Sequence, residues 1–180
     1  MRQRTISDNF WRDPRTSDLS QEDKATLLYF LTSPSSNIAG VYQVIPRIAA
    51  AEMGWTSDQL LSVVERLQEK GLICFRPDGW IWVKIWWSHN AINGAFSPKL
   101  FKNTKSQILA MPNEWHAEYA KILENSGLDR VSIPYLDVID TLHRNSNGNF
   151  KSSLKAEQAL SDAKKILAGA TEMVSGGEKN

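Results

Sequence analysis

The sequence predicts a mainly α-helical protein that contains one small antiparallel β-hairpin. Three observations support this fold class. Apolar residues recur at helical spacing after a capping serine, Ser20, and two further short helical segments are separated by a turn that begins at Gly54. In the stretch "LICFRPDGWIWVKIWW", residues 72–87, a Pro-Asp-Gly turn separates two runs that are rich in β-branched and aromatic residues.

Composition limits the classes of protein to consider. The 180 residues are 42% hydrophobic and 23% charged, which is typical of a globular chain. The formal net charge is only +1, so nucleic-acid binding would need a local basic face. A single cysteine, Cys74, excludes an internal disulfide and is expected to be a structural core thiol. Apolar runs are too short for a membrane span and the N-terminus does not resemble a secretory signal, so we expect a cytoplasmic protein without membrane contact.

The first predicted helix starts at Ser20, with two acidic residues in its first turn and an apolar stripe that includes Leu27 and Leu31. A short strand is expected within residues 38–44, at a sheet edge. A second helix begins at Pro46 and ends at Gly54.

Thr56 or Ser57 is expected to cap a third helix, which runs to Lys70 and ends at Gly71. Two short helices joined by about four residues have the spacing of a helix-turn-helix.

The second strand of the hairpin is predicted to span residues 80–87. Period-two alternation places one uniformly apolar set toward the core: Ile81, Val83, Ile85 and Trp87. The opposite set mixes tryptophan with lysine and is expected to be half exposed: Trp80, Trp82, Lys84 and Trp86. Trp82 and Trp86 are expected to pack beneath the helices that follow, although stacking on unpaired bases is an alternative.

The order helix, strand, helix, turn, helix, hairpin is typical of a winged helix-turn-helix domain, followed here by a C-terminal helical extension. We therefore divide the chain into four parts: a basic N-terminal arm at 1–17, the winged helix domain at 18–95, a helical extension at 96–143, and a linker with a polar C-terminal helix or tail at 144–180. The pair Phe10 and Trp11 indicates that part of the arm docks on the domain.

Motifs for catalysis are not found in the sequence. It has no phosphate-binding loop, no Gly-x-Gly-x-x-Gly after a strand and no Cys-x-x-Cys or His-x-His pair, and its three histidines are far apart. We therefore expect no enzyme activity, no cofactor and no metal.

A DNA-binding surface is the alternative that remains. In a winged helix the third helix enters a groove and the hairpin contacts a neighbouring groove or the backbone. The candidate residues on the helix are Ser57, Gln59, Ser62 and Arg66, and those on the hairpin are Arg76 and Lys84. Further candidate cations are Arg2, Arg4, Arg47, Lys99, Lys102 and Lys105. Residues 58–70 have a net charge of −1, which opposes this interpretation.

Four stretches together form a specific pattern: "NFWRDPRTSDLSQEDKATLLYFLTS", "GVYQV", "LQEKGLI" and "WIWVKIWWSHNAIN". Over about residues 9–100 the chain resembles the N-terminal winged helix domain of phage and mobile-element replication initiators, the replisome organisers. The resemblance implies binding to repeated duplex sites at an origin through residues 56–70 and the hairpin, with a replicative helicase or its loader as a partner. The chain departs from the family in its acidic third helix and its short C-terminal segment, in which no helicase-loading domain is recognised.

Three hypotheses follow. The leading one is sequence-specific binding of double-stranded DNA in phage or mobile-element replication initiation. A transcriptional regulator with the same domain would differ only in its DNA site. An adaptor of a different class would use the acidic third helix to dock another protein, with Trp82 or Trp86 as apolar anchors. The segment after Trp87 is the expected place for any homodimer contact.

Overall fold

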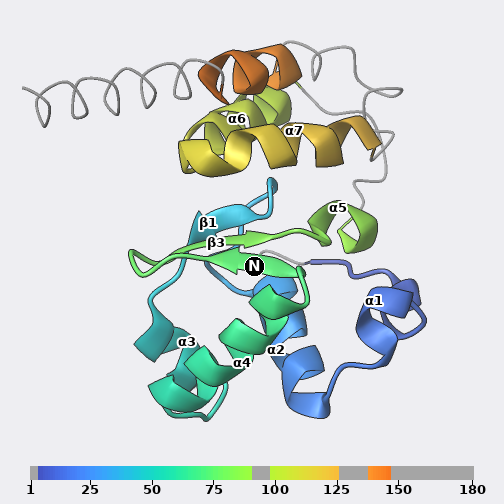
Figure 1. Ribbon diagram of the computed structural model, residues 1–180, viewed down its shortest axis with the longest axis vertical. Helices are drawn as coiled ribbons and strands as arrows, with labels where there is room; N and C mark the ends of the chain where they lie inside the picture. Colours follow the sequence, from blue (N-terminus) through green and yellow to red (C-terminus); the bar gives the residue numbers. More distant parts are fainter. Residues whose placement is uncertain (1–3, 91–97, 126–137, 147–180) are drawn as a thin grey trace, which may run out of the picture.

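The computed structural model describes residues 4–90, 98–125 and 138–146. This part of the chain is mainly helical and contains a three-stranded antiparallel sheet with strand order β1-β3-β2. The sheet lies between two helical layers, with α2, α3 and α4 on one side and α6 and α7 on the other (Figure 1). Among the described residues, no helix has the length and apolar character needed to cross a bilayer.

The elements from α2 to β3 have the predicted order, whereas the short helices η1, α1 and α5 were not predicted. The elements and their bounds are η1 (Asp8–Trp11), α1 (Pro14–Ser17), α2 (Gln21–Thr32), β1 (Val41–Gln43), α3 (Pro46–Glu52), α4 (Ser57–Glu69), β2 (Ile73–Phe75), β3 (Trp80–Val83), α5 (Trp86–His89), α6 (Pro98–Leu109), η2 (Asn113–Trp115) and α7 (His116–Asn125). Residues 138–146 are also helical and therefore continue past the predicted boundary at 143. The predicted polar helix after 150 lies outside the described residues.

Local side-chain chemistry sets the starts of the two longest helices below the sheet. The Ser20 hydroxyl accepts a hydrogen bond from the backbone N–H of Asp23 at 3.0 Å and caps α2. Thr56 and Gln59 form a reciprocal capping box at the start of α4. Gly54 has φ +71, the left-handed conformation that ends a helix, so the predicted turn before α4 is confirmed.

Strand β3 is shorter than predicted. Its neighbours supply partners only as far as Val83, which pairs with Ile73 at the start of β2. The backbone N–H of Lys84 donates to the Leu72 carbonyl, and the chain then turns into α5 at Trp86. The expectation of a strand through residue 87 was wrong because no strand lies alongside β3 beyond this point.

The tryptophans of the hairpin are more buried than predicted. Trp82 is 1% exposed, with its ring centroid 5.4 Å from that of Tyr119 and 6.1 Å from that of Trp115. Trp86 is equally buried, and its indole N–H donates to the Ile38 carbonyl at 2.7 Å. The expectation of a half-exposed face was wrong for these two residues, and neither ring is available to stack on bases. For Trp82, packing beneath the later helices is confirmed.

The apolar face of β3 has the predicted orientation. Ile81, Val83 and Ile85 are buried in the core that also contains the apolar stripes of α2 and α4. The N-terminal segment adds Phe10 to this core, while its neighbour Trp11 remains exposed. The backbone N–H of Ser7 donates to the carbonyl of His89 at 3.0 Å. Part of the arm therefore docks on the domain, where it contacts α5, as the aromatic pair predicted.

Two glycines with the same backbone conformation provide a test of this packing. Gly40 (φ +72) lies against the Trp86 ring, which a Cβ atom would penetrate, whereas nothing lies within 4 Å of the corresponding position at Gly54 (φ +71). We expect Gly54→Ala to lower the free energy of unfolding by about 1–2 kcal/mol, the cost of a left-handed alanine. Gly40→Ala should cost about 1–3 kcal/mol more because it overpacks the indole. Urea titration followed by tryptophan fluorescence measures both, and equal losses would contradict the proposed contact.

Candidate nucleic-acid interface

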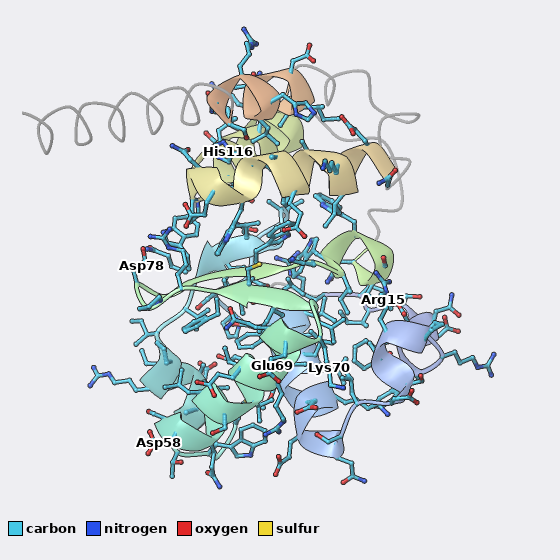
Figure 2. All side chains as sticks on the ribbon, in the orientation of Figure 1. Arg15, Asp58, Glu69, Lys70, Asp78 and His116 are labelled. Atoms are coloured by element: carbon cyan, nitrogen blue, oxygen red, sulfur yellow. The ribbon has the colours of Figure 1, made fainter. Side chains whose placement is uncertain are left out.

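Helix α4 has an acidic outer edge. Leu60, Val63, Val64 and Leu67 are buried on its inner side. Asp58, Glu65 and Glu69 recur at spacings of seven and four residues, so they lie in one line on the opposite, exposed side. Figure 2 shows Asp58 and Glu69 near the two ends of the helix, with Lys70 just beyond. The row of α4 side chains that is most accessible to a ligand is therefore negatively charged.

Three of the predicted DNA-binding side chains come together on the α2 side of α4. Gln59, Ser62 and Arg66 line a hollow of about 340 Å³, together with Trp55 and Glu22. The Gln59 side-chain oxygen accepts a hydrogen bond from the Thr56 backbone N–H at 2.9 Å. The amide nitrogen of Gln59 and the hydroxyl of exposed Ser62 are hydrogen-bond donors that a ligand in this hollow can reach. The fourth predicted residue, Ser57, is half-buried at the start of the helix.

Arg66 is held by carboxylates of α2. Its guanidinium lies 2.8 Å from the Asp23 carboxylate and 3.1 Å from that of Glu22. The hydrogen bond to Asp23, supported by that to Glu22, raises the pKa of Arg66. The side chain of Asp23 is only 4% exposed, so its charge depends on this arginine for compensation. Arg66 therefore fixes α4 against α2, a role that the DNA-binding prediction did not include.

The cations of the hairpin are also paired. Arg76 bonds Asp78 at 2.9 Å and makes an ion pair with Glu114, while Lys84 lies 2.6 Å from Glu118. The hydrogen bond to Asp78 is the main cause of the raised pKa of Arg76. Burial is the largest single influence on the pKa of Lys84 and lowers it, but the hydrogen bond to Glu118 and the interactions with Glu118 and Cys74 together raise this pKa above its ordinary value. The pairs with Glu114 and Glu118 join the hairpin to η2 and α7.

Of the other predicted cations that the structure describes, only Arg47 lies on a helix that packs against α4. Arg4 donates to the Ser36 carbonyl at 3.1 Å and lies over the Trp86 ring. Arg47 on α3 is exposed, whereas Lys102 is exposed on α6, in the layer across the sheet (Figure 1). Lys105 is half-buried on α6. Arg2 and the side chain of Lys99 lie outside the described residues. A continuous basic surface built from the arm, hairpin and later lysines is therefore not assembled in the described part.

The carboxylates that neutralise these cations were not among the predicted site residues. Glu22 and Asp23 are recognisable in the sequence as first-turn acids of a helix, but their contact with Arg66 spans more than forty positions.

Among the described residues, no three His, Cys, Asp or Glu side chains gather closely enough to hold a metal ion. Comparison of the chain with known family models, curated proteins and solved structures finds no match.

Substitution of Arg66 should reveal its structural role. Arg66→Met leaves the Asp23 carboxylate nearly buried without its main partner, so we expect the free energy of unfolding to fall by about 1–3 kcal/mol. Arg47→Met is the matched control, because Arg47 is exposed and makes no ion pair within the described part of the chain, and it should change stability by less than about 0.5 kcal/mol. Chemical denaturation compares the two. If Arg66→Met left the free energy of unfolding unchanged, the ion pair would be unimportant for stability.

Two buried histidines predict a loss of stability in mild acid. His89 donates from Nε2 to Asp13 at 2.9 Å, and Nε2 of His116 donates to the Met111 carbonyl at 3.2 Å. The Nδ1 atom of each ring is buried without a hydrogen-bond partner among the described residues. Burial lowers the pKa of both imidazoles below the ordinary 6.5, because a proton on Nδ1 would find neither water nor an acceptor.

The sign of the effect follows from proton uptake. Just below pH 6.5 the unfolded chain binds protons that the folded histidines do not, so the free energy of unfolding falls as pH decreases. Each histidine contributes a slope of at most about 1.4 kcal/mol per pH unit, until its lowered pKa is passed. Urea midpoints between pH 7.5 and 5 measure the slope. His89→Gln and His116→Gln should each reduce it, and an unchanged slope in the double variant would refute the assignment.

Proposed function

We propose that the chain is a winged helix protein that binds double-stranded DNA and acts in phage or mobile-element replication initiation. The observation that supports this proposal most strongly is the arrangement of α2, β1, α3, α4 and the β2–β3 hairpin. A four-residue turn precedes α4, and the hairpin follows α4 directly in the chain, which is the element order expected of a winged helix. The motifs that resemble replication initiators begin at Asn9 and end at Asn93, so the span that they mark covers all of these elements.

DNA contact on this surface would depend on exchange of ion-pair partners. Glu22 and Glu114, which bond Arg66 and Arg76, are both exposed. A phosphate could take the place of either carboxylate while Arg66 kept its bond to Asp23, so little rearrangement of the backbone would be needed. Arg47 and Lys70 add exposed positive charge, and Gln59 and Ser62 would face base edges.

The acidic edge of α4 makes this interface weak by itself. Asp58, Glu65 and Glu69 would lie close to phosphates on either side of a groove and would repel them. We therefore expect modest affinity with a steep dependence on salt, because release of counterions supplies most of the favourable free energy. Specific sites would add base contacts to this electrostatic component.

Fluorescence anisotropy with labelled duplex DNA at two salt concentrations tests the proposal. Arg47→Ala should weaken binding and reduce the salt slope by about 1. Glu22→Gln should tighten binding, because it removes the competitor that holds Arg66. Lys121→Ala is the control, since Lys121 is exposed on α7 in the opposite helical layer, and it should leave affinity unchanged. Absence of binding at low salt would refute DNA binding by the chain. Equal effects of Arg47→Ala and Lys121→Ala would refute the assignment of DNA binding to the surface of α3 and α4.

A protein-docking module is the second candidate, and the acidic edge of α4 favours it. Trp82 and Trp86 cannot be its anchors because both are buried, so exposed apolar residues of α3 and α4 would take that role. A transcriptional regulator would use the DNA surface described above, at a different DNA site.

A further inference from the structure

An apolar groove lies on the hairpin side of α4. Leu61, Val64, Phe75, Pro46 and Pro77 line a hollow of about 450 Å³ between α3, α4 and the hairpin, together with Glu65. This groove and the hollow at Gln59 lie on opposite flanks of α4, because Leu61 and Gln59 are two positions apart on the helix and so about 200° apart around its axis. The two hollows are therefore separate sites.

Most of the exposed large apolar side chains in the described part of the chain lie on α3, its N-cap and α4. Four large hydrophobic residues are exposed in the described part of the chain, and three of them belong to α3, its N-cap and α4: Ile45, Ile48 and Leu61. Leu61 is 36% exposed and lines the groove, whereas Ile45 and Ile48 line a separate hollow. An exposed leucine within a concave apolar surface is typical of a site that another protein covers.

The charge next to the groove is negative. Asp58, Glu65 and Glu69 make no ion pair with any other described residue. The nearest arginine of the helix, Arg66, faces the other flank and is neutralised by Asp23 and Glu22. Glu65 therefore lines the groove without an ion-pair partner among the described residues, and Asp58 and Glu69 continue the same acidic row along α4.

We propose that this groove binds an amphipathic, lysine- or arginine-rich helical segment of a partner protein. Apolar side chains of the segment would fill the hollow against Leu61 and Phe75, and its basic side chains would pair with Glu65, Asp58 and Glu69. The same charges argue against two other occupants. Phosphates of DNA would be repelled, and a second copy placed by a two-fold axis would bring acidic edges together.

The proposal goes beyond DNA binding and does not depend on it. The probe is a synthetic, fluorescently labelled helical peptide of leucine and lysine with one apolar face, and the comparison peptide has glutamate in place of lysine. In buffer without DNA, the lysine peptide should bind and the glutamate peptide should not. Leu61→Ser should weaken binding about tenfold or more, as expected for an apolar anchor. Glu65→Gln with Glu69→Gln should also weaken it and flatten its salt dependence.

Matched control variants distinguish binding in the groove from non-specific binding to exposed apolar or acidic side chains elsewhere. Trp11→Ser removes an exposed apolar side chain on the N-terminal segment, and Asp140→Asn removes an exposed acid on the helix at 138–146, so both should leave peptide affinity unchanged. Since Leu61 is partly exposed, its substitution should keep the urea midpoint, which confirms that the variant is folded.

Three results would overturn the proposal. Equal binding of the two peptides, or equal binding by wild type and Leu61→Ser, would show that the groove does not select a basic amphipathic segment. Sedimentation velocity showing a dimer that Leu61→Ser dissociates would assign the groove to a second copy of the chain. Loss of duplex DNA binding in Leu61→Ser would assign it to nucleic acid. Because the peptide assay contains no DNA, failure of the DNA-binding proposal alone would leave its result unchanged.

Discussion

Burial of strand β3 on both of its faces is the constraint on which the rest of the structure depends. Ile81 and Val83 face the helices below the sheet, and Trp82 packs against Trp115 and Tyr119 from the layer above. A strand covered on both sides must be apolar throughout, which explains why tryptophan alternates with isoleucine and valine here. The extension after residue 97 therefore completes the core of the sheet, since without it the large ring of Trp82 would be exposed to water.

This arrangement determines what the positive charges do. Once η2 and α7 cover the sheet, their acidic residues lie beside the hairpin, and Glu114 and Glu118 pair with Arg76 and Lys84. On the other layer, packing of α4 against α2 brings Arg66 to Asp23. Cations that look available in the linear sequence thus join elements to each other. The surface that remains on α4 is acidic at its outer edge, polar on one flank and apolar on the other.

The two proposed activities follow from these flanks. A nucleic-acid contact would use the polar flank and would compete with carboxylates for its arginines, whereas the apolar flank and the acidic edge suit a basic protein segment. Replication initiators must contact both an origin and a protein partner, so a module with two different flanks on one helix is consistent with the proposed function. The acidic edge would reduce the affinity of one ligand and increase that of the other.

The sequence by itself determined the elements that depend on neighbouring residues. Ser20, Thr56, Gly54 and Gly71 mark helix ends, and Pro77 to Gly79 mark the turn of the hairpin, because caps and turns are decided by hydrogen bonds and φ angles within a few residues. The inward orientation of Ile81 and Val83 followed from period-two alternation.

Only the tertiary structure decided where β3 stops, that both of its faces are covered, and which cations have partners. Each of these depends on residues far apart in the sequence, such as Arg66 and Asp23 or Trp82 and Tyr119. Alternation reports that two sides of a strand differ, but it does not report whether a later helix will cover the second side. Likewise, a count of charges does not reveal which are neutralised, because ion pairing depends on distances that arise only when the layers pack.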